Sequence, residues 1–199
     1  MKNRVFFMVQ KLGNIAEIQF GSYDKPQEEG SVKYLHAGHF DKLLKPTKFE
    51  ESFVELDGKN DKFLLQPNDV VLAGKGYRTF AWAYDVDFGQ AIPSSLFYII
   101  RTNSSEVLGA YLAHYLNTEK SQYKLKLIGA GATITSIPKK ELAQLNIVLP
   151  SIDEQRKIVD FIDLLDEDLK LTQDLLNKRT ALKKGLINRL INNEIKMKT

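Results

Sequence analysis

The sequence predicts an α+β fold, in which an irregular, mixed α/β domain precedes one long C-terminal helix. Short apolar segments with strand spacing alternate with segments that have helical spacing over residues 1–150. No proline follows Pro150, which leaves room for about 44 residues of uninterrupted helix. Because 43% of the 199 residues are apolar, the chain can form a hydrophobic core. We therefore divide it into a globular domain, residues 1–150, and a long helix, residues 151–199.

The globular domain mixes short helices with short strands. We expect a helix over residues 12–18 with Asn14 as its N-cap, and a second helix behind a capping box formed by Asn103 and Glu106. A short third helix follows Pro138. The periodicity and the turn residues predict strands over 32–35, 70–73, 78–84, 95–100 and 145–149.

The long helix begins at another capping box, which is formed by Ser151 and Glu154. At 1.5 Å per residue, about 44 residues extend roughly 66 Å, which is unusual in a chain of this size. Such a helix either spans two globular bodies or pairs with another helix. Gly185 costs about 1 kcal/mol of helix propensity, so we expect it to mark close packing or a bend.

Charge is distributed unevenly along this helix. Residues 153–174 carry a net charge of −5, and residues 178–198 carry +6. The helix dipole favours acids at the start and bases at the end, but its effect fades within the first and last turns. The asymmetry here covers both halves. Two antiparallel copies would therefore place each acidic half beside a basic half, whereas parallel copies would stack like charges.

Apolar residues of the helix form a wide stripe that drifts around its surface. We assign dimerisation to a first seam, which consists of Ile158, Ile162, Leu165, Leu169, Leu176, Leu186 and Leu190. A neighbouring seam partly takes over where Thr172, Arg179 and Lys183 interrupt the first; it contains Phe161, Leu164, Leu171, Leu175 and Leu182. This width suits a partner helix together with a globular surface better than a strict two-stranded zipper.

Motifs for catalysis are missing from the sequence. The chain has no cysteine, and His36, His39 and His114 form no HExxH pattern, so we expect no metal site. The sequence around Lys75 is not a P-loop, no GxSxG elbow occurs, and all six prolines are isolated, which excludes an Asn-Pro-Pro-Tyr methyltransferase motif. No apolar run is long enough to cross a membrane, and we expect a cytoplasmic protein. The chain is more typical of a recognition or assembly protein.

The loop at residues 74–79 is the best functional candidate. Gly74 and Gly76 allow close backbone approach, Lys75 and Arg78 supply donors for phosphate or guanine, and Tyr77 offers a stacking face. A basic hairpin turn with ordinary surface charges is an equally good interpretation of these residues alone.

Several segments together resemble the specificity subunit of type I restriction–modification systems. They occur in the order of that family and cover nearly the whole chain. The segments are LGNIAEI (12–18) with FGS (20–22), LQPNDVVLAGKG (65–76), YLAHYLN (111–117), GATI (131–134), IPKKEL (137–142) and IVLPSIDEQRKIV (147–159).

The resemblance implies a target recognition domain over residues 1–150 and a spacer and dimerisation helix over 151–199. Members of that family usually carry two of each, whereas this chain has one of each and no internal repeat, so it resembles a half-subunit. The family's twofold arrangement would then come from a homodimer, with the two helices forming an antiparallel coiled coil.

The resemblance also implies DNA binding without catalysis. Each chain would read half of a bipartite target in double-stranded DNA, and the helices would dock methyltransferase subunits. Those subunits would bind S-adenosylmethionine, so the chain itself needs no cofactor, and a restriction subunit can join the complex. Our candidates for DNA contact are Lys75, Tyr77, Arg78, Thr79, Ser22, Tyr23, Lys25, Lys33, His36 and Thr133.

Two alternatives remain open. The chain could be a solitary or phage-type DNA-binding dimer that captures a host methyltransferase to alter or block restriction. It could also be a structural coiled-coil adaptor without any affinity for DNA.

Overall fold

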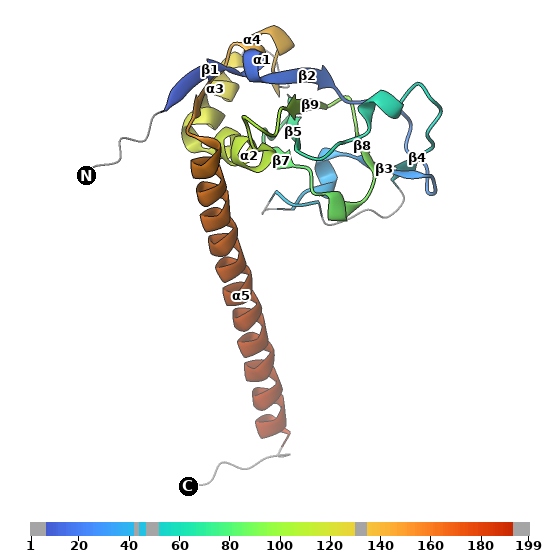
Figure 1. Ribbon diagram of the computed structural model, residues 1–199. Coiled ribbons are helices and arrows are strands. Elements are labelled where there is room, and N and C mark those ends of the chain that lie inside the picture. The colour runs from blue at the N-terminus through green and yellow to red at the C-terminus, as the bar shows by residue number, and fades with distance from the viewer. Residues whose placement is uncertain (1–6, 42–43, 47–51, 130–134, 193–199) are drawn as a thin grey trace, which may run out of the picture. The chain divides into compact units, whose positions relative to one another are not determined.

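The computed structural model describes residues 7–41, 44–46, 52–129 and 135–192. The chain divides into two compact units, Met1–Lys157 and Ile158–Thr199, which we describe separately (Figure 1).

A four-stranded antiparallel sheet forms the centre of the first unit. Its order is β2-β9-β5-β7, and the strands are β2 Ala16–Phe20, β9 Phe97–Thr102, β5 Asp69–Ala73 and β7 Ala81–Ala83. Every residue of β5 is buried, which explains the unbroken apolar run from Val70 to Ala73. Helix α2, Gly109–Asn117, packs against β5 and β7. The Asn117 side chain holds β7 by bonding both the N–H and the carbonyl of Ala81, each at 2.8 Å.

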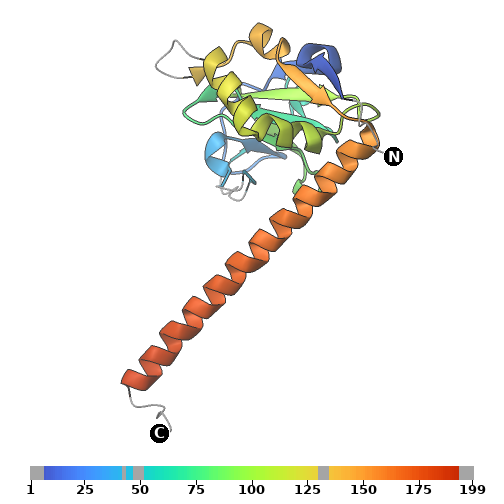
Figure 2. The same ribbon diagram turned by 90° about the vertical axis from the view of Figure 1, so that its left-hand side faces the viewer.

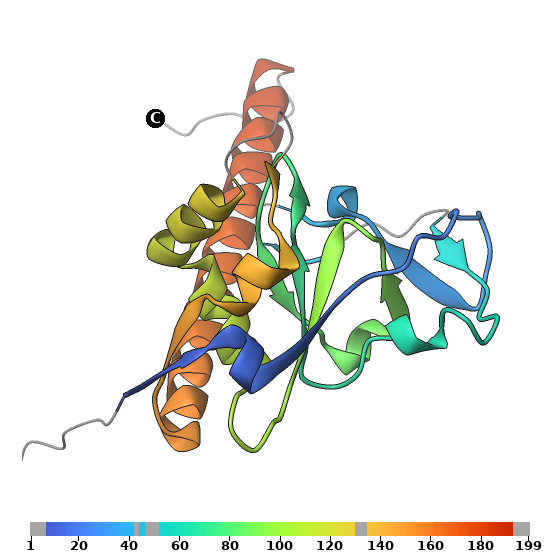
Figure 3. The same cartoon turned by 90° about the horizontal axis from the view of Figure 1, so that it is seen from above.

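A second, three-stranded sheet lies on the other side of the central strands from helix α3, Glu119–Ile128 (Figure 3). It joins β4 Phe53–Val54, β3 Val32–Leu35 and β8 Ala91–Pro93, with β3 and β8 parallel. Two short antiparallel pairs complete the strands: β1 Met8–Lys11 with β11 Asn146–Leu149, and β6 Lys75–Gly76 with β10 Thr135–Ser136.

Short helices connect these strands. They are α1 Leu12–Ile15, α3 Glu119–Ile128, α4 Lys139–Ala143 and the 3₁₀ turns η1 Ala37–His39, η2 Asp61–Phe63 and η3 Val86–Phe88. Figure 2 looks onto α2 and α3, with strands behind them. An aromatic cluster of Phe40, Phe80 and Phe97 fills the core between the central sheet and η1, with ring centroids 4.9 to 6.0 Å apart.

The predicted α+β fold with a long C-terminal helix is confirmed, and so are the strand at 32–35, the buried strand at 70–73 and the short helix after Pro138. The predicted helix over 12–18 is wrong in its second half, because residues from Ala16 onward pair with β9 along their whole length. Edge pairing in a sheet therefore overrides the local capping signal at Asn14. Helix α3 was not expected.

The predicted capping box of Asn103 and Glu106 is also wrong. Asn103 closes a turn by accepting from the N–H of Ser105 at 3.1 Å, and α2 begins only at Gly109. The Asn68 side chain, which comes from the turn before β5, accepts the Gly109 N–H at 2.6 Å. A distant residue thus replaces the local cap. A Cβ at Gly109 would lie 2.4 Å from the Asn68 carbonyl oxygen, so this position requires glycine.

Helix α5, Ile152–Ile191, begins in the first unit and forms the described part of the second. The Ser151 half of the predicted capping box is confirmed, since the Ser151 hydroxyl accepts from the N–H of Glu154 at 3.3 Å, whereas the Glu154 carboxylate lies 3.6 Å from the Lys157 ammonium. The apolar residues of both seams from Leu164 onward are exposed. Among the described residues, no helix has the length and apolarity that a membrane crossing requires.

Candidate functional site

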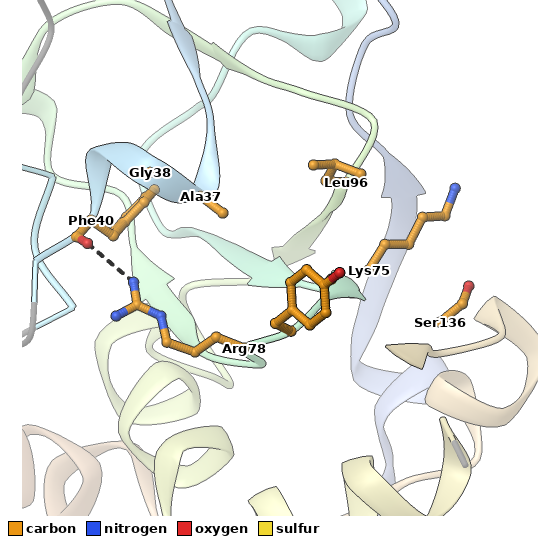
Figure 4. Close-up of a pocket in the computed structure, with 9 residues that line it drawn as sticks. Ala37, Gly38, Phe40, Lys75, Arg78, Leu96 and Ser136 are labelled. Atoms are coloured by element: carbon orange, nitrogen blue, oxygen red, sulfur yellow. Dashed lines mark hydrogen bonds between the residues drawn. The ribbon is translucent and has the colours of Figure 1, made fainter. Parts of the chain in front are cut away.

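An open pocket of about 750 Å³ lies where several loops of the first unit meet (Figure 4). The segments that line it are far apart in the sequence. They are η1, the loop after β5, the residue before β9 and strand β10, which contribute Ala37, Gly38, Phe40, Lys75, Gly76, Tyr77, Arg78, Leu96 and Ser136. The pocket therefore brings together three of the predicted DNA-contact residues: Lys75, Tyr77 and Arg78.

Gly74 fixes the start of the pocket loop by its contact with a tyrosine ring. A Cβ at Gly74 would lie 2.5 Å from the Tyr98 ring carbons, so no larger residue fits there without a shift. The Tyr98 hydroxyl donates to the carbonyl of Ile137 at 2.6 Å, and the Ile137 N–H donates to the Gly74 carbonyl at 2.9 Å. Burial raises the pKa of Tyr98 to about 12, which keeps this donor protonated. Gly76 has φ +122°, a conformation that favours glycine.

Lys75 lies at the rim of the pocket. Its ammonium is 4.7 Å from the centroid of the Phe20 ring, which in turn stacks on Tyr98 at 4.4 Å. This cation–π contact positions the side chain and leaves ammonium donors that can bind an acceptor. Figure 4 shows the Lys75 side chain directed away from Arg78. The neighbouring Tyr77 is 95% exposed, which suits it for stacking on a ligand.

Arg78 contacts the protein itself. Its guanidinium donates to the carbonyls of Phe40 at 3.1 Å and Asp41 at 3.3 Å, and lies 4.6 Å from the Phe80 ring centroid (Figure 4). These contacts tie the pocket loop to η1. Arg78 therefore positions the loop, and only its remaining N–H groups can reach a ligand.

The first loop divides into exposed and buried candidates. Tyr23 is 93% exposed and Lys25 is also exposed. Ser22 is buried: its hydroxyl bonds Asp24, and its carbonyl accepts from the Tyr34 hydroxyl at 2.8 Å. Thr79, at the end of the pocket loop, is partly buried.

Lys33 and His36 are also partly turned into the protein. The Lys33 ammonium donates to the carbonyl of Phe88 and lies 4.3 Å from its ring centroid. The His36 ring packs edge-on against Tyr34 at 4.7 Å, and the backbone N–H of His36 donates to Nδ1 of His39 at 3.0 Å. Burial lowers the pKa of both histidines. In the described part of the chain, no three His, Asp or Glu side chains cluster as metal ligands would.

The glycine loop with Thr133 lies outside the described residues, so the structure does not describe that candidate. The sequence did not single out Ala37, Gly38, Leu96 or Ser136 as pocket residues. Small or apolar residues carry no chemical signal of their own, and only the fold brings them to the loop at 74–79.

The turn that leads into β5 has a structural role. The buried Asp69 carboxylate accepts two hydrogen bonds from Arg101, at 2.9 and 2.8 Å, and one from the backbone N–H of Gln66 at 2.8 Å. The hydrogen bonds to Asp69 raise the pKa of Arg101. Asn68 caps α2 as described above, so this turn locks the central sheet to that helix.

Gln155 plays a similar part at the start of α5. It is fully buried, and its Nε2 donates to the carbonyls of Glu106 at 2.9 Å and Pro150 at 3.1 Å. Its Oε1 accepts from the N–H of Leu108 at 3.0 Å. Two of these bonds join the first turn of α5 to the segment before α2, and the third goes to Pro150 just before α5, which gives a physical reason for glutamine at this point of the sequence.

The fold combines an α+β domain, with basic and aromatic side chains around an open loop pocket, and a long helix with exposed apolar seams. This combination is typical of a recognition protein. The chain belongs to the family of type I restriction modification DNA specificity domains, whose model matches residues 5–179. The family is one of DNA-recognition components rather than catalysts, in agreement with the prediction from the sequence.

Known proteins similar to this chain are specificity subunits. A protein of Methanocaldococcus jannaschii, assigned as the specificity subunit of the type I restriction enzyme MjaX, is 28% identical over 100 residues, which are 50% of this chain and 23% of that protein. The crystal structure of a type I S subunit from M. genitalium matches 95% of this chain and 46% of its own, with a TM-score of 0.64 and 16% identity. The HsdS subunit from Thermoanaerobacter tengcongensis matches 83% of this chain and 38% of its own, with a TM-score of 0.53 and 19% identity.

A third structure comes from work on complex assembly and conformational transition of the type I R-M system. It matches 90% of this chain and 43% of its own, with a TM-score of 0.57 and 19% identity. At these identities the structural matches establish the fold. The chain spans less than half the length of each of these relatives.

Proposed function

We propose that this chain is the DNA sequence-recognition component of a type I restriction–modification complex, and that each copy binds half of a bipartite target. The observation that carries the proposal is the family match over residues 5–179, which includes both the pocket loop and most of α5. In this proposal residues 1–150 act as a target recognition domain and residues 151–199 as a spacer and dimerisation helix.

The proposed DNA-binding face is the rim of the loop pocket. Lys75 supplies an ammonium at the rim, and Tyr77 and Tyr23 are almost fully exposed aromatic residues. Cations bind phosphates, and exposed aromatic and polar side chains contact bases, which is the combination that sequence recognition needs. We expect a smaller contribution to DNA contact from Lys25, Thr79 and Arg78. Ser22, Lys33 and His36 make contacts within the protein, so we expect them to support the face from behind.

Methyltransferase subunits are the proposed protein partners, with S-adenosylmethionine bound to them and not to this chain. Two copies of the chain would form a homodimer through α5, whose apolar seams are exposed and whose halves carry opposite charge. Two identical recognition domains related by a twofold axis would read an interrupted palindrome. A restriction subunit can join the same assembly.

Co-purification with type I methyltransferase subunits tests this proposal directly. We expect a stable complex that contains two copies of the chain and binds duplex DNA. A chain that binds DNA as a dimer but forms no complex would support a solitary DNA-binding protein. A chain that joins the methyltransferase without any gain in duplex affinity would contradict the recognition role and support a structural adaptor.

A further inference from the structure

The second apolar seam of α5 belongs to an unbroken heptad repeat along one face of the helix. Its members alternate in spacing between three and four residues, the pattern by which one helix face contacts a partner helix. They are Phe161, Leu164, Asp168, Leu171, Leu175, Lys178, Leu182, Gly185 and Arg189. The five apolar members are 50% to 62% exposed. We use the name second seam for these nine residues.

Gly185 has no structural reason within the described chain. A Cβ built on it meets no atom within 4 Å, and its φ lies outside the region that favours glycine. Glycine in a helix interior is less favourable than alanine by about 1 kcal/mol. A residue that is costly in the isolated helix is explained if a bulky side chain of a partner occupies the space beside it.

We propose that the second seam packs antiparallel against the second seam of a second copy, with Leu171 opposite Leu175. In an antiparallel pair, a step toward the N-terminus of one helix matches an equal step toward the C-terminus of its partner. Starting from Leu171 opposite Leu175, Asp168 therefore lies opposite Lys178 and Leu164 opposite Leu182. The complete set of layers is Leu171–Leu175, Asp168–Lys178, Leu164–Leu182 and Phe161–Gly185.

Each layer of this register is complementary. The largest side chain of the seam, Phe161, lies opposite Gly185, which has none. Asp168 and Lys178, of opposite charge, face each other in both halves of the pair. The remaining layers join leucines, so no charge is left opposite an apolar residue between Phe161 and Gly185.

Other registers of the second seam lose this complementarity. A shift by one heptad in one direction puts Phe161 opposite Lys178 and Asp168 opposite Leu171. The shift in the other direction puts Lys178 opposite Leu175. Parallel packing puts Asp168 opposite its own copy, and Lys178 likewise, which repels at both layers.

Self-packing through the first seam is less favourable than through the second. When Ile158 lies opposite Leu190, Leu165 lies opposite Lys183 and Leu169 opposite Arg179. Self-pairing therefore falls to the second seam instead of the first seam that residue spacing predicts, and the first seam stays outside the contact. This pairing rests on the proposed dimer.

The charge distribution agrees with the register. Along the helix, the twofold axis lies at the level of Gln173, near the boundary between the acidic residues 153–174 and the basic residues 178–198. The same register brings Asp174 close to its own copy across the axis. We therefore expect Asp174→Asn to tighten the dimer at low salt.

Cross-linking of cysteine variants tests the register, because the chain contains no cysteine of its own. The double variant Leu164→Cys/Leu182→Cys in the full chain should be joined into covalent dimers by a short bifunctional maleimide. Each single variant should remain uncross-linked, since its thiol lies far along the helix from its own copy. Cross-linking of either single variant would indicate parallel packing and overturn the proposal.

The control variant Ile162→Cys/Leu186→Cys reports packing through the first seam. Efficient cross-linking there, without cross-linking of Leu164→Cys/Leu182→Cys, would overturn the register while leaving the dimer of the proposed function intact. Light scattering of the unmodified chain separates the two claims. A chain that stays monomeric, alone and with the methyltransferase, would overturn both.

Charge reversal gives an independent readout of the Asp168–Lys178 layer. Asp168→Lys and Lys178→Asp should each raise the dimer dissociation constant about tenfold, and the double variant should return it to within about threefold of the original. Asp163→Lys, which makes the same charge change away from both seams, is the matched control. Failure of the double variant to recover would contradict the assigned layer.

Discussion

Replacement of Lys75 by alanine tests the proposed DNA-binding face. The ammonium of Lys75 rests on the Phe20 ring at the pocket rim, and its N–H donors can reach a phosphate. Loss of one phosphate contact lowers the dependence of log affinity on log salt by about 0.9. If two chains bind one duplex through the same contact, the slope falls by roughly 1.8. The size of the change therefore also reports how many chains are bound.

The assay is fluorescence anisotropy of a mixed-sequence duplex over a series of salt concentrations, with the reconstituted complex. A phosphate contact predicts weaker binding to all sequences alike. Lys59→Ala is the matched control, because Lys59 is exposed and does not line the pocket. Unchanged affinity and slope for Lys75→Ala would remove this residue from the interface and refute the reasoning for the pocket rim.

Three further predictions concern the elements that hold the site. Gln155→Ala removes the three hydrogen bonds of a fully buried side chain and should lower the free energy of unfolding by at least about 2 kcal/mol, measured by urea denaturation; an unchanged midpoint would contradict the role of Gln155. Gly74→Ala should cost about 1–3 kcal/mol and weaken DNA binding, because its Cβ meets the Tyr98 ring, and a neutral effect would show that the loop yields easily. Burial lowers the pKa of His36 and His39 in the folded protein. Their contribution to the free energy of unfolding is therefore fully present above the unfolded pKa of about 6.5 and is lost as pH falls through the folded pKa. Urea midpoints should therefore drop between about pH 7.5 and pH 5.5, and the drop should be smaller in His36→Gln/His39→Gln; an equal drop would assign the acid sensitivity to other groups.

The sequence predicts a strand well where every residue of the strand is both apolar and buried. The run from Val70 to Ala73 is apolar at every position and is buried at every position. Strand β2 was missed because its sequence has one buried residue, Ile18, and its pairing partner β9 lies about 80 residues away along the chain. The cap of α2 was misplaced for the same reason, since Asn68 supplies it from a distant turn.

The sequence singled out the loop of the candidate site, but not its geometry. Basic and aromatic residues between glycines drew attention to the loop at 74–79, and only the fold shows that it lines a pocket. The sequence does not reveal that Arg78 binds the Phe40 and Asp41 carbonyls or that Lys33 binds that of Phe88. Gly74 was expected to admit a ligand, whereas it makes room for the Tyr98 ring. Such contacts depend on residues that only the fold brings together.

The long helix was predicted well because proline and the cap mark its start and no tertiary contact is needed to define it. Its two seams also follow from residue spacing. Both seams are exposed from Leu164 onward, so exposure does not distinguish them; the proposed choice of the second seam rests on the pairing of its layers and on the open space beside Gly185.

Base-resolution mapping of the methylation placed by the reconstituted complex tests the central claim most directly. Two identical recognition domains on antiparallel helices predict an interrupted palindrome, with two inverted half-sites at a fixed separation. A single asymmetric or continuous target would contradict the claim that two copies of this chain each read half of the site.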